Sequence, residues 1–198
     1  MTKFPADMNA LLGSRICHDL ISPIGAIGNG VELLQLSGVG DSEELSLITE
    51  SVENANARIR LFRVAFGAAA PGQRISASEI AGILVTMGAN RRIDFQWPLA
   101  ADPMRDEARL VFLLLLCCES AMPRGGRVTV DTTDGTIRIV AEAERLRVEP
   151  ETWRLLEAPM TDLPAAADIH FPLAHSAAEG LGRALTTRIG ETQILIDA

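Results

Sequence analysis

Cysteine and long hydrophobic runs are both scarce in this chain of 198 residues, which contains three cysteines. Cys117 and Cys118 are neighbours in an apolar segment and Cys17 lies far from them, so we expect no disulfide framework. The longest apolar run, Leu110–Cys118, is about half as long as a membrane-spanning helix requires. The first residues show no secretory signal pattern. We therefore expect a cytoplasmic protein without a membrane partner.

Basic residues are also in deficit. The chain has 18 Lys and Arg against 26 Asp and Glu, a formal net charge of −8 at pH 7. This balance argues against nucleic acid as a general partner. With 47% hydrophobic and 22% charged residues, the composition is that of a globular chain rather than a disordered one. The length allows one large or two small domains.

The first part of the chain carries a helical apolar pattern. Apolar side chains recur at intervals of three and four residues: Leu12, Ile16, Leu20, Ile24, Ile27, Val31 and Leu34. This spacing predicts an amphipathic α-helix with one apolar stripe. At about 100° per residue, His18 points almost directly away from the stripe, so we expect its ring to face water. Its own face is mostly small or polar and offers a shallow surface to another protein: Ser14, Ser22, Gly25, Asn29 and Glu32.

His18 stands in the run His18-Asp19-Leu20-Ile21-Ser22-Pro23. A histidine that accepts phosphate needs an exposed ring on a rigid element and a polar neighbour that orients the ring. Asp19 is adjacent to His18, and Ser22 lies one helical turn further on. Pro23 costs about 3 kcal/mol inside a helix and indicates a kink. The simpler interpretation is that His18 is a solvated helix residue without a special role.

A second helix is predicted after a loop at residues 37–42, where Gly38 ends the first helix and Asp41 or Ser42 caps the next. Its apolar stripe is Leu45, Ile48, Val52, Ala55, Ile59, Phe62 and Phe66. Residues 8–70 therefore form an antiparallel helical hairpin. Because one hairpin cannot enclose a core and two copies make a four-helix bundle, we expect a homodimer. The arginines of this helix are interpreted as a solvated face, with docking of an acidic protein surface as the alternative: Arg58, Arg60 and Arg63.

A linker at residues 68–73 precedes a segment in which helices and strands alternate. The predicted domains are residues 1–72 and residues 73–198. In the second domain, helices are expected from the capping pattern Ser76–Glu79, from Pro103, at Glu149–Glu157 and at Ser176–Arg188. Strands are expected within Arg92–Pro98, Arg127–Thr132, Thr136–Glu142 and Gln193–Asp197. The predicted fold class is α+β, a helical hairpin followed by an α/β sandwich.

The motif around His18 carries a resemblance to known signalling proteins. His-Asp-Leu-Ile-Ser-Pro resembles the phosphoacceptor box of sensor histidine kinases, His-Glu/Asp-Leu-x-Thr/Asn-Pro. The longer run Cys17–Ile27, followed by Asn29-Gly30 and Glu32-Leu33-Leu34, more closely resembles the alphaproteobacterial histidine phosphotransferases of the ChpT type. This similarity covers about the first 70 residues. Beyond them, the order of elements is similar to that of the ATP-binding domain of histidine kinases.

The predicted second domain departs from the kinase pattern where kinases bind nucleotide. Leu113 and Cys117 stand where the kinases carry two asparagines that hold magnesium and phosphates, and neither is a suitable magnesium ligand. The adenine-binding Asp-x-Gly-x-Gly loop is replaced by residues 141–146, which contain no glycine. Gly180-Leu181-Gly182 is a weak match to the phosphate-binding glycines. We therefore expect a degenerate ATPase-like domain that binds no cofactor and no metal.

The resemblance implies a histidine phosphotransferase of a phosphorelay. Receiver domains of a hybrid histidine kinase and of response regulators would be its partners, and the receiver would supply Mg²⁺. His18 would be the nucleophile, with Asp19 and Ser22 orienting its ring. The residues expected to dock a receiver are Ser14, Arg15, Ile21, Gly25 and Asn29. Two alternatives remain: a non-catalytic adaptor or inhibitor of a histidine kinase, and an ATP-dependent histidine kinase.

Other conspicuous side chains are weaker candidates. His170 and His175 are five residues apart, so they do not share a regular helical face, and no cysteine lies near them in sequence. Zinc binding is therefore not expected. Trp97 and Trp153 are interpreted as packing residues rather than binding platforms.

Overall fold

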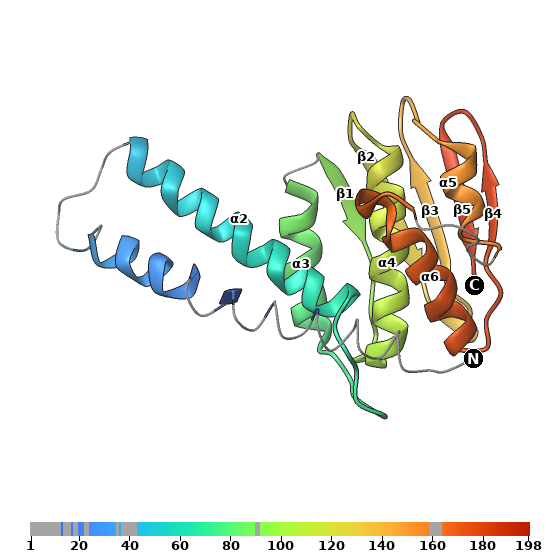
Figure 1. Ribbon diagram of the computed structural model, residues 1–198, viewed down its shortest axis with the longest axis horizontal. Coiled ribbons are helices and arrows are strands. Elements are labelled where there is room, and N and C mark those ends of the chain that lie inside the picture. Colours follow the sequence, from blue (N-terminus) through green and yellow to red (C-terminus); the bar gives the residue numbers. More distant parts are fainter. Residues whose placement is uncertain are drawn as a thin grey trace. The chain divides into compact units, whose positions relative to one another are not determined.

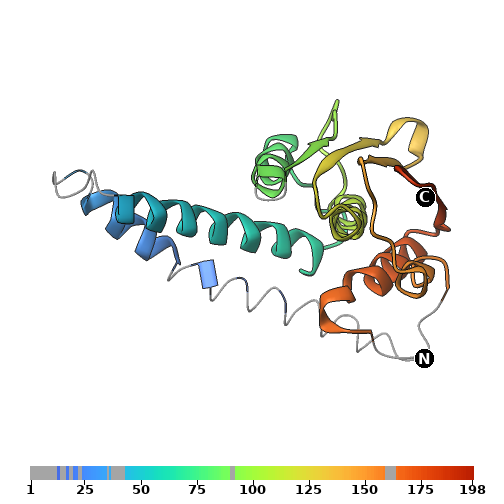
Figure 2. The ribbon, with the colours of Figure 1, turned by 90° about the horizontal axis from the view of Figure 1, so that it is seen from above.

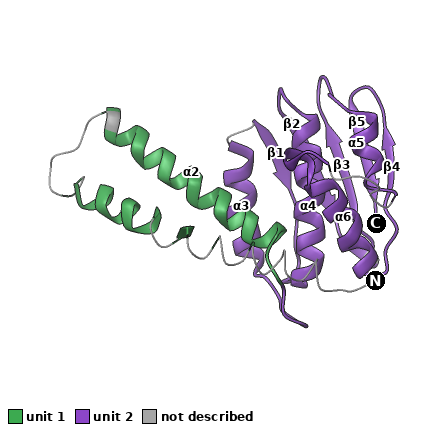
Figure 3. Ribbon diagram, viewed as in Figure 1, with its two compact units in different colours: residues 1–68 green, residues 69–198 purple. Residues whose placement is uncertain are grey.

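The computed structural model describes residues 24–34, 43–89, 92–158 and 164–198, together with Gly13, Cys17, Leu20, Ile21 and Leu36; for Glu44 and Asp134 it describes the backbone alone. The chain divides into two compact units, residues 1–68 and residues 69–198 (Figure 3). Helices and a five-stranded sheet are both present, so the fold class is α+β, as predicted.

Two helices form the described part of the first unit. One is continuous over residues 24–34 and also includes residues 13, 17, 20, 21 and 36. The other is α2, Glu43–Ala65. A Cβ added to Gly28 would lie 3.3 Å from Val52 Cγ1, and one added to Gly13 would lie 3.2 Å from the Phe66 backbone oxygen. The earlier residue of the first helix contacts the later residue of α2, and the later residue contacts the earlier one. The two helices therefore run antiparallel and side by side (Figure 2).

The second unit is built on a sheet with the strand order β1-β2-β3-β5-β4. The strands are β1 (Ile93–Gln96), β2 (Gly126–Asp131), β3 (Arg138–Glu142), β4 (Thr186–Ile189) and β5 (Gln193–Asp197). β1 and β2 are parallel, and every other neighbouring pair is antiparallel. Alternate residues of β2, β3 and β5 are buried, because their side chains point toward the helical side of the sheet: Val128, Val130, Ile139, Ala141, Ile194 and Ile196.

The helices of this unit are α3 (Ala77–Ala89), α4 (Arg105–Ala121), α5 (Pro150–Arg154) and α6 (His170–Gly180). The Ser76 hydroxyl accepts a hydrogen bond from the Glu79 N–H at 3.1 Å, which is the predicted cap of α3. Every residue from Leu110 to Cys118 in α4 is buried. The longest apolar run of the sequence is therefore the core helix of a globular unit. α4 packs beside α6, and both lie in front of the strands in Figure 1.

The predicted helix over Ser176–Arg188 is wrong. α6 ends at Gly180 and the chain continues as strand β4, Thr186–Ile189. Gly182 has a φ of +69°, the Gly182 N–H donates to Glu179 O, and the Arg183 N–H donates to Ala178 O. These bonds form a Schellman motif, which ends a helix at a glycine of positive φ. The β-branched residues that follow favour a strand.

Candidate functional site

The predicted site residues fall into two groups. Ser14, Arg15, His18, Asp19 and Ser22 lie outside the described residues. Ile21, Gly25 and Asn29, which lie on the same predicted helix, are described. The geometry of the site is therefore built from these three residues and from their described neighbours.

Gly25 and Asn29 leave one face of the first helix open. Asn29 is exposed, Gly25 is partly exposed, and no atom of the described residues lies within 4 Å of a Cβ added to Gly25. A glycine inside a helix costs about 1 kcal/mol relative to alanine, and no neighbour among the described residues requires one here. The missing side chain at Gly25 leaves room for an approaching molecule. Ile21 is partly buried and offers an apolar contact at the edge of this face.

The predicted apolar stripe of the first helix is only partly covered. Cys17 and Val31 are 6% and 7% exposed, whereas Leu20 and Ile27 are 45% and 53% exposed. Within the single chain, the predicted apolar stripe is therefore buried in part and exposed in part. The stripe is wider than one neighbouring helix covers, and residues seven apart, such as Leu20 and Ile27, remain together on an open side.

An apolar groove runs along that open side, between the first helix and α2. Its volume is about 350 Å³, and its lining is Ile24, Ile27, Leu47, Ile48, Ser51, Val52 and Ala55. Leu47 and Ile48 are 62% and 45% exposed. A continuous exposed apolar surface of this kind is typical of a protein interface.

Two arginines of α2 have defined surroundings in the first unit. The Arg58 guanidinium lies over the Phe62 ring, 5.6 Å from its centroid. Burial raises the pKa of the Cys17 thiol, and the positive charge of Arg63 partly opposes this rise. Arg63 therefore acts electrostatically on the residue that precedes His18. From the sequence, Arg63 was interpreted as part of a solvated basic face. The apolar pattern of one helix does not show which of its residues lie opposite a given residue of the other helix.

The two α4 residues that the resemblance sets in the positions of the kinase asparagines are core side chains. Leu113 and Cys117 are both fully buried in α4. Burial raises the pKa of the Cys117 thiol well above its ordinary value, so this group stays protonated. Trp153 and Phe171 pack edge to face in the core of the same unit, with ring centroids 5.4 Å apart. Neither α4 residue offers an oxygen ligand to a magnesium–nucleotide complex.

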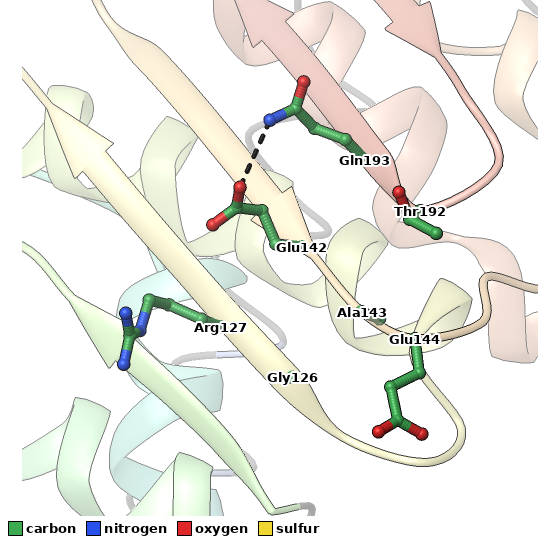
Figure 4. Close-up of a pocket in the computed structure, with 7 residues that line it drawn as sticks. All are labelled: Gly126, Arg127, Glu142, Ala143, Glu144, Thr192 and Gln193. Atoms are coloured by element: carbon green, nitrogen blue, oxygen red, sulfur yellow. Dashed lines mark hydrogen bonds between the residues drawn. The ribbon is translucent and has the colours of Figure 1, made fainter.

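A polar hollow of about 520 Å³ opens where β3 ends and β5 begins (Figure 4). Its lining is Gly126, Arg127, Glu142, Ala143, Glu144, Thr192 and Gln193. The Arg127 guanidinium is paired with Asp94 at 3.1 Å, and the Gln193 amide donates to Glu142 at 3.3 Å. The two glutamates repel phosphate, so this hollow is poorly suited to the phosphates of a nucleotide.

The remaining candidates, two tryptophans and two histidines, lie in the packed interior or on α6 of the second unit. Trp97 and Trp153 are 7% and 4% exposed, which confirms them as packing residues. His170 and His175 both lie on α6, and His175 Nδ1 is 2.9 Å from the Leu156 carbonyl oxygen. Among the described residues, no group of three His, Cys, Asp or Glu side chains is placed to hold a metal ion. Within the same residues, no helix is both long and apolar enough to cross a membrane.

Comparisons with known proteins agree with this architecture. A family described as histidine phosphotransferase C-terminal domain matches residues 77–193. The protein phosphotransferase ChpT of Brucella abortus (strain 2308) is 38% identical over 155 residues, which cover 75% of this chain and 74% of ChpT. A solved bacterial phosphotransferase is 30% identical and has a TM-score of 0.69, with 100% of this chain and 98% of that chain covered.

A more distant structure shares the fold alone. Full-length ShkA in complex with AMPPNP is 13% identical with a TM-score of 0.50, over 94% of this chain and 45% of that one. The relatives and the α+β architecture together define a phosphotransferase. More specifically, the chain belongs to the histidine phosphotransferase family that includes ChpT, whose members act in phosphorelays.

Proposed function

We propose that this phosphotransferase accepts a phosphoryl group on His18 from a receiver aspartate of a hybrid histidine kinase. It then passes the group to the receiver domains of response regulators. The observation that carries this proposal is the full burial of Leu113 and Cys117 in α4, where a kinase needs magnesium and phosphate ligands. A phosphotransferase without those ligands needs a donor that is already phosphorylated.

His18 is the nucleophile of this proposal. Its neutral imidazole attacks through Nε2 and forms a phosphohistidine intermediate. Asp19 orients the ring and selects the tautomer, and Ser22 assists from one helical turn away. Phosphoryl transfer depends mainly on such positioning and on neutralisation of charge, so few catalytic groups are needed.

The receiver docks on the face of the first helix that carries His18. Ser14, Arg15, Ile21, Gly25 and Asn29 form the contact surface in this proposal. The open space at Gly25 supports it, because a receiver must bring its aspartate close to the helix backbone. The receiver also supplies the Mg²⁺ ion, so this chain contributes no metal ligand and no cofactor.

The working form is a cytoplasmic homodimer. Residues 1–72 form the hairpin domain for dimerisation and phosphotransfer, and residues 73–198 form a degenerate ATPase-like domain. Two hairpins pair through their open apolar sides into a four-helix bundle. The exposed Leu20, Ile27 and Leu47 support this arrangement, since pairing would remove them from water.

The test is single-turnover transfer from a pre-phosphorylated receiver to the purified protein. We expect acid-labile label on the wild type, none on His18→Ala, and slower labelling on Asp19→Ala. The two variants must retain the thermal unfolding midpoint of the wild type. Full labelling of His18→Ala would contradict the assignment. If His18→Ala instead kept all regulatory output without carrying phosphate, the protein would be an adaptor.

A further inference from the structure

One cationic side chain of α2 lies beside the turn of the first helix that contains Cys17. The charge of Arg63 acts on the Cys17 thiol, opposing the larger effect of burial. Because the interaction between charges falls with distance, the guanidinium lies in the neighbourhood of Cys17 rather than elsewhere on α2. His18 is the next residue of the chain, and consecutive Cα atoms are about 3.8 Å apart.

The packing of the two helices places Arg63 there independently of its charge. The first helix contacts α2 at Gly13 with Phe66 and at Gly28 with Val52. Between these contacts, each step forward along the first helix corresponds to one step back along α2. Residue 17 therefore lies opposite residues 62 and 63.

Arg63 is also accessible. It lies in the last turn of α2, and its side chain is exposed, whereas Cys17 is 6% exposed. An exposed guanidinium on a helix end has the reach and the planar donors to bind a phosphoryl group bidentately. A phosphohistidine adds about two negative charges at this turn, which the neutral ring lacked.

We propose that Arg63 binds the phosphoryl group carried by His18, both in the phosphohistidine and during its transfer. This inference rests on the proposed function of His18. In the forward step, the Nε2 lone pair of the neutral imidazole forms the N–P bond. The P–O bond to the receiver aspartate breaks, and its electron pair remains on the aspartate carboxylate. The three phosphoryl oxygens keep their charge throughout, and Arg63 donates hydrogen bonds to them.

The experiment compares Arg63→Gln with wild type in full-length protein, using the same pre-phosphorylated receiver. Arg60→Gln is the matched control, because it removes the same charge from an exposed position of the same helix. We expect Arg63→Gln to slow labelling of His18 by about tenfold or more, the effect of one hydrogen bond to a charged group. The labelling rate of Arg60→Gln should remain within about twofold of wild type, because a solvent-exposed charge contributes little.

Two further readouts separate phosphoryl binding from a structural role. Arg63→Lys should recover part of the rate, because it keeps the charge but loses the planar fork. Added salt should slow wild type more than Arg63→Gln, since screening weakens the interaction that the variant lacks. Thermal unfolding midpoints should be the same for all variants.

The wild-type reaction and the comparison of variants answer different questions. No label on the wild type would reject the proposed function itself. Label on the wild type with an unchanged rate in Arg63→Gln would reject the role of Arg63 alone. Equal losses in Arg63→Gln and Arg60→Gln would also reject it, because the effect would then come from the general charge of α2.

Discussion

At the scale of single residues, burial decides which ionisable groups can change charge. His170 at the start of α6 is 8% exposed, and its Nε2 has no hydrogen-bond partner among the residues that the structure describes. Removal from water lowers the pKa of His170 below 6.5, although Asp168 and the Ala167 backbone act in the opposite direction. The folded protein therefore holds this ring neutral at pH values where the unfolded chain begins to protonate it.

This difference predicts a loss of stability in mild acid. Below about pH 6.5, the unfolded state binds a proton at His170 that the folded state does not, so the free energy of unfolding falls. The fall continues until the pH reaches the folded pKa, with a slope of at most about 1.4 kcal/mol per pH unit. Urea unfolding measures the free energy of unfolding at pH 7.5 and at pH 5.5. Its decrease between the two pH values should be larger for wild type than for His170→Gln. Equal losses would mean that His170 is not protonated on unfolding.

The same scale shows what a sequence can reveal about a site. Spacing on one helix and the motif after Cys17 were sufficient to predict the family and to nominate His18. The burial of Trp97 and Trp153 was also predicted. Arg63 was named only together with Arg58 and Arg60, as a solvated face or a docking surface, because its place beside Cys17 depends on how α2 packs against another helix.

At the scale of elements, the end of α6 shows where the sequence pattern misled. Apolar and small residues continue past Gly180 at helical spacing, so the pattern predicted one long helix to Arg188. Gly182 ends the helix instead, because its positive φ allows two backbone hydrogen bonds that close the last turn. The freed segment becomes the edge strand β4, which pairs with β5.

Gly182 and Gly180 make a matched pair for testing this helix end. Gly182→Ala forces a side chain into a left-handed backbone and should lower the free energy of unfolding by about 1 kcal/mol. Gly180→Ala has open space and no positive φ, so stability should stay the same or rise slightly. Urea denaturation measures both. A Gly182→Ala protein as stable as wild type would show that this backbone conformation is not required.

At the scale of the whole molecule, the exposed apolar side of the first unit predicts self-association. Leu47→Glu places a charge in the groove, whereas Ser46→Glu places the same charge on the neighbouring exposed position of α2. Burying a charge at an apolar interface is costly, so Leu47→Glu should shift the dimer toward monomer. Ser46→Glu should remain dimeric. Light scattering during size-exclusion chromatography gives the mass, and a monomeric wild type at about micromolar concentration would contradict the dimer.

The route of the phosphoryl group tests the whole account most directly. Wild-type protein would be offered labelled ATP with Mg²⁺ in one reaction and a pre-phosphorylated receiver in another, each beside His18→Ala. The account predicts acid-labile label on wild type from the receiver, none from ATP, and none on His18→Ala from either donor. Label from ATP alone would contradict it, because the buried Leu113 and Cys117 would then not have removed the nucleotide site.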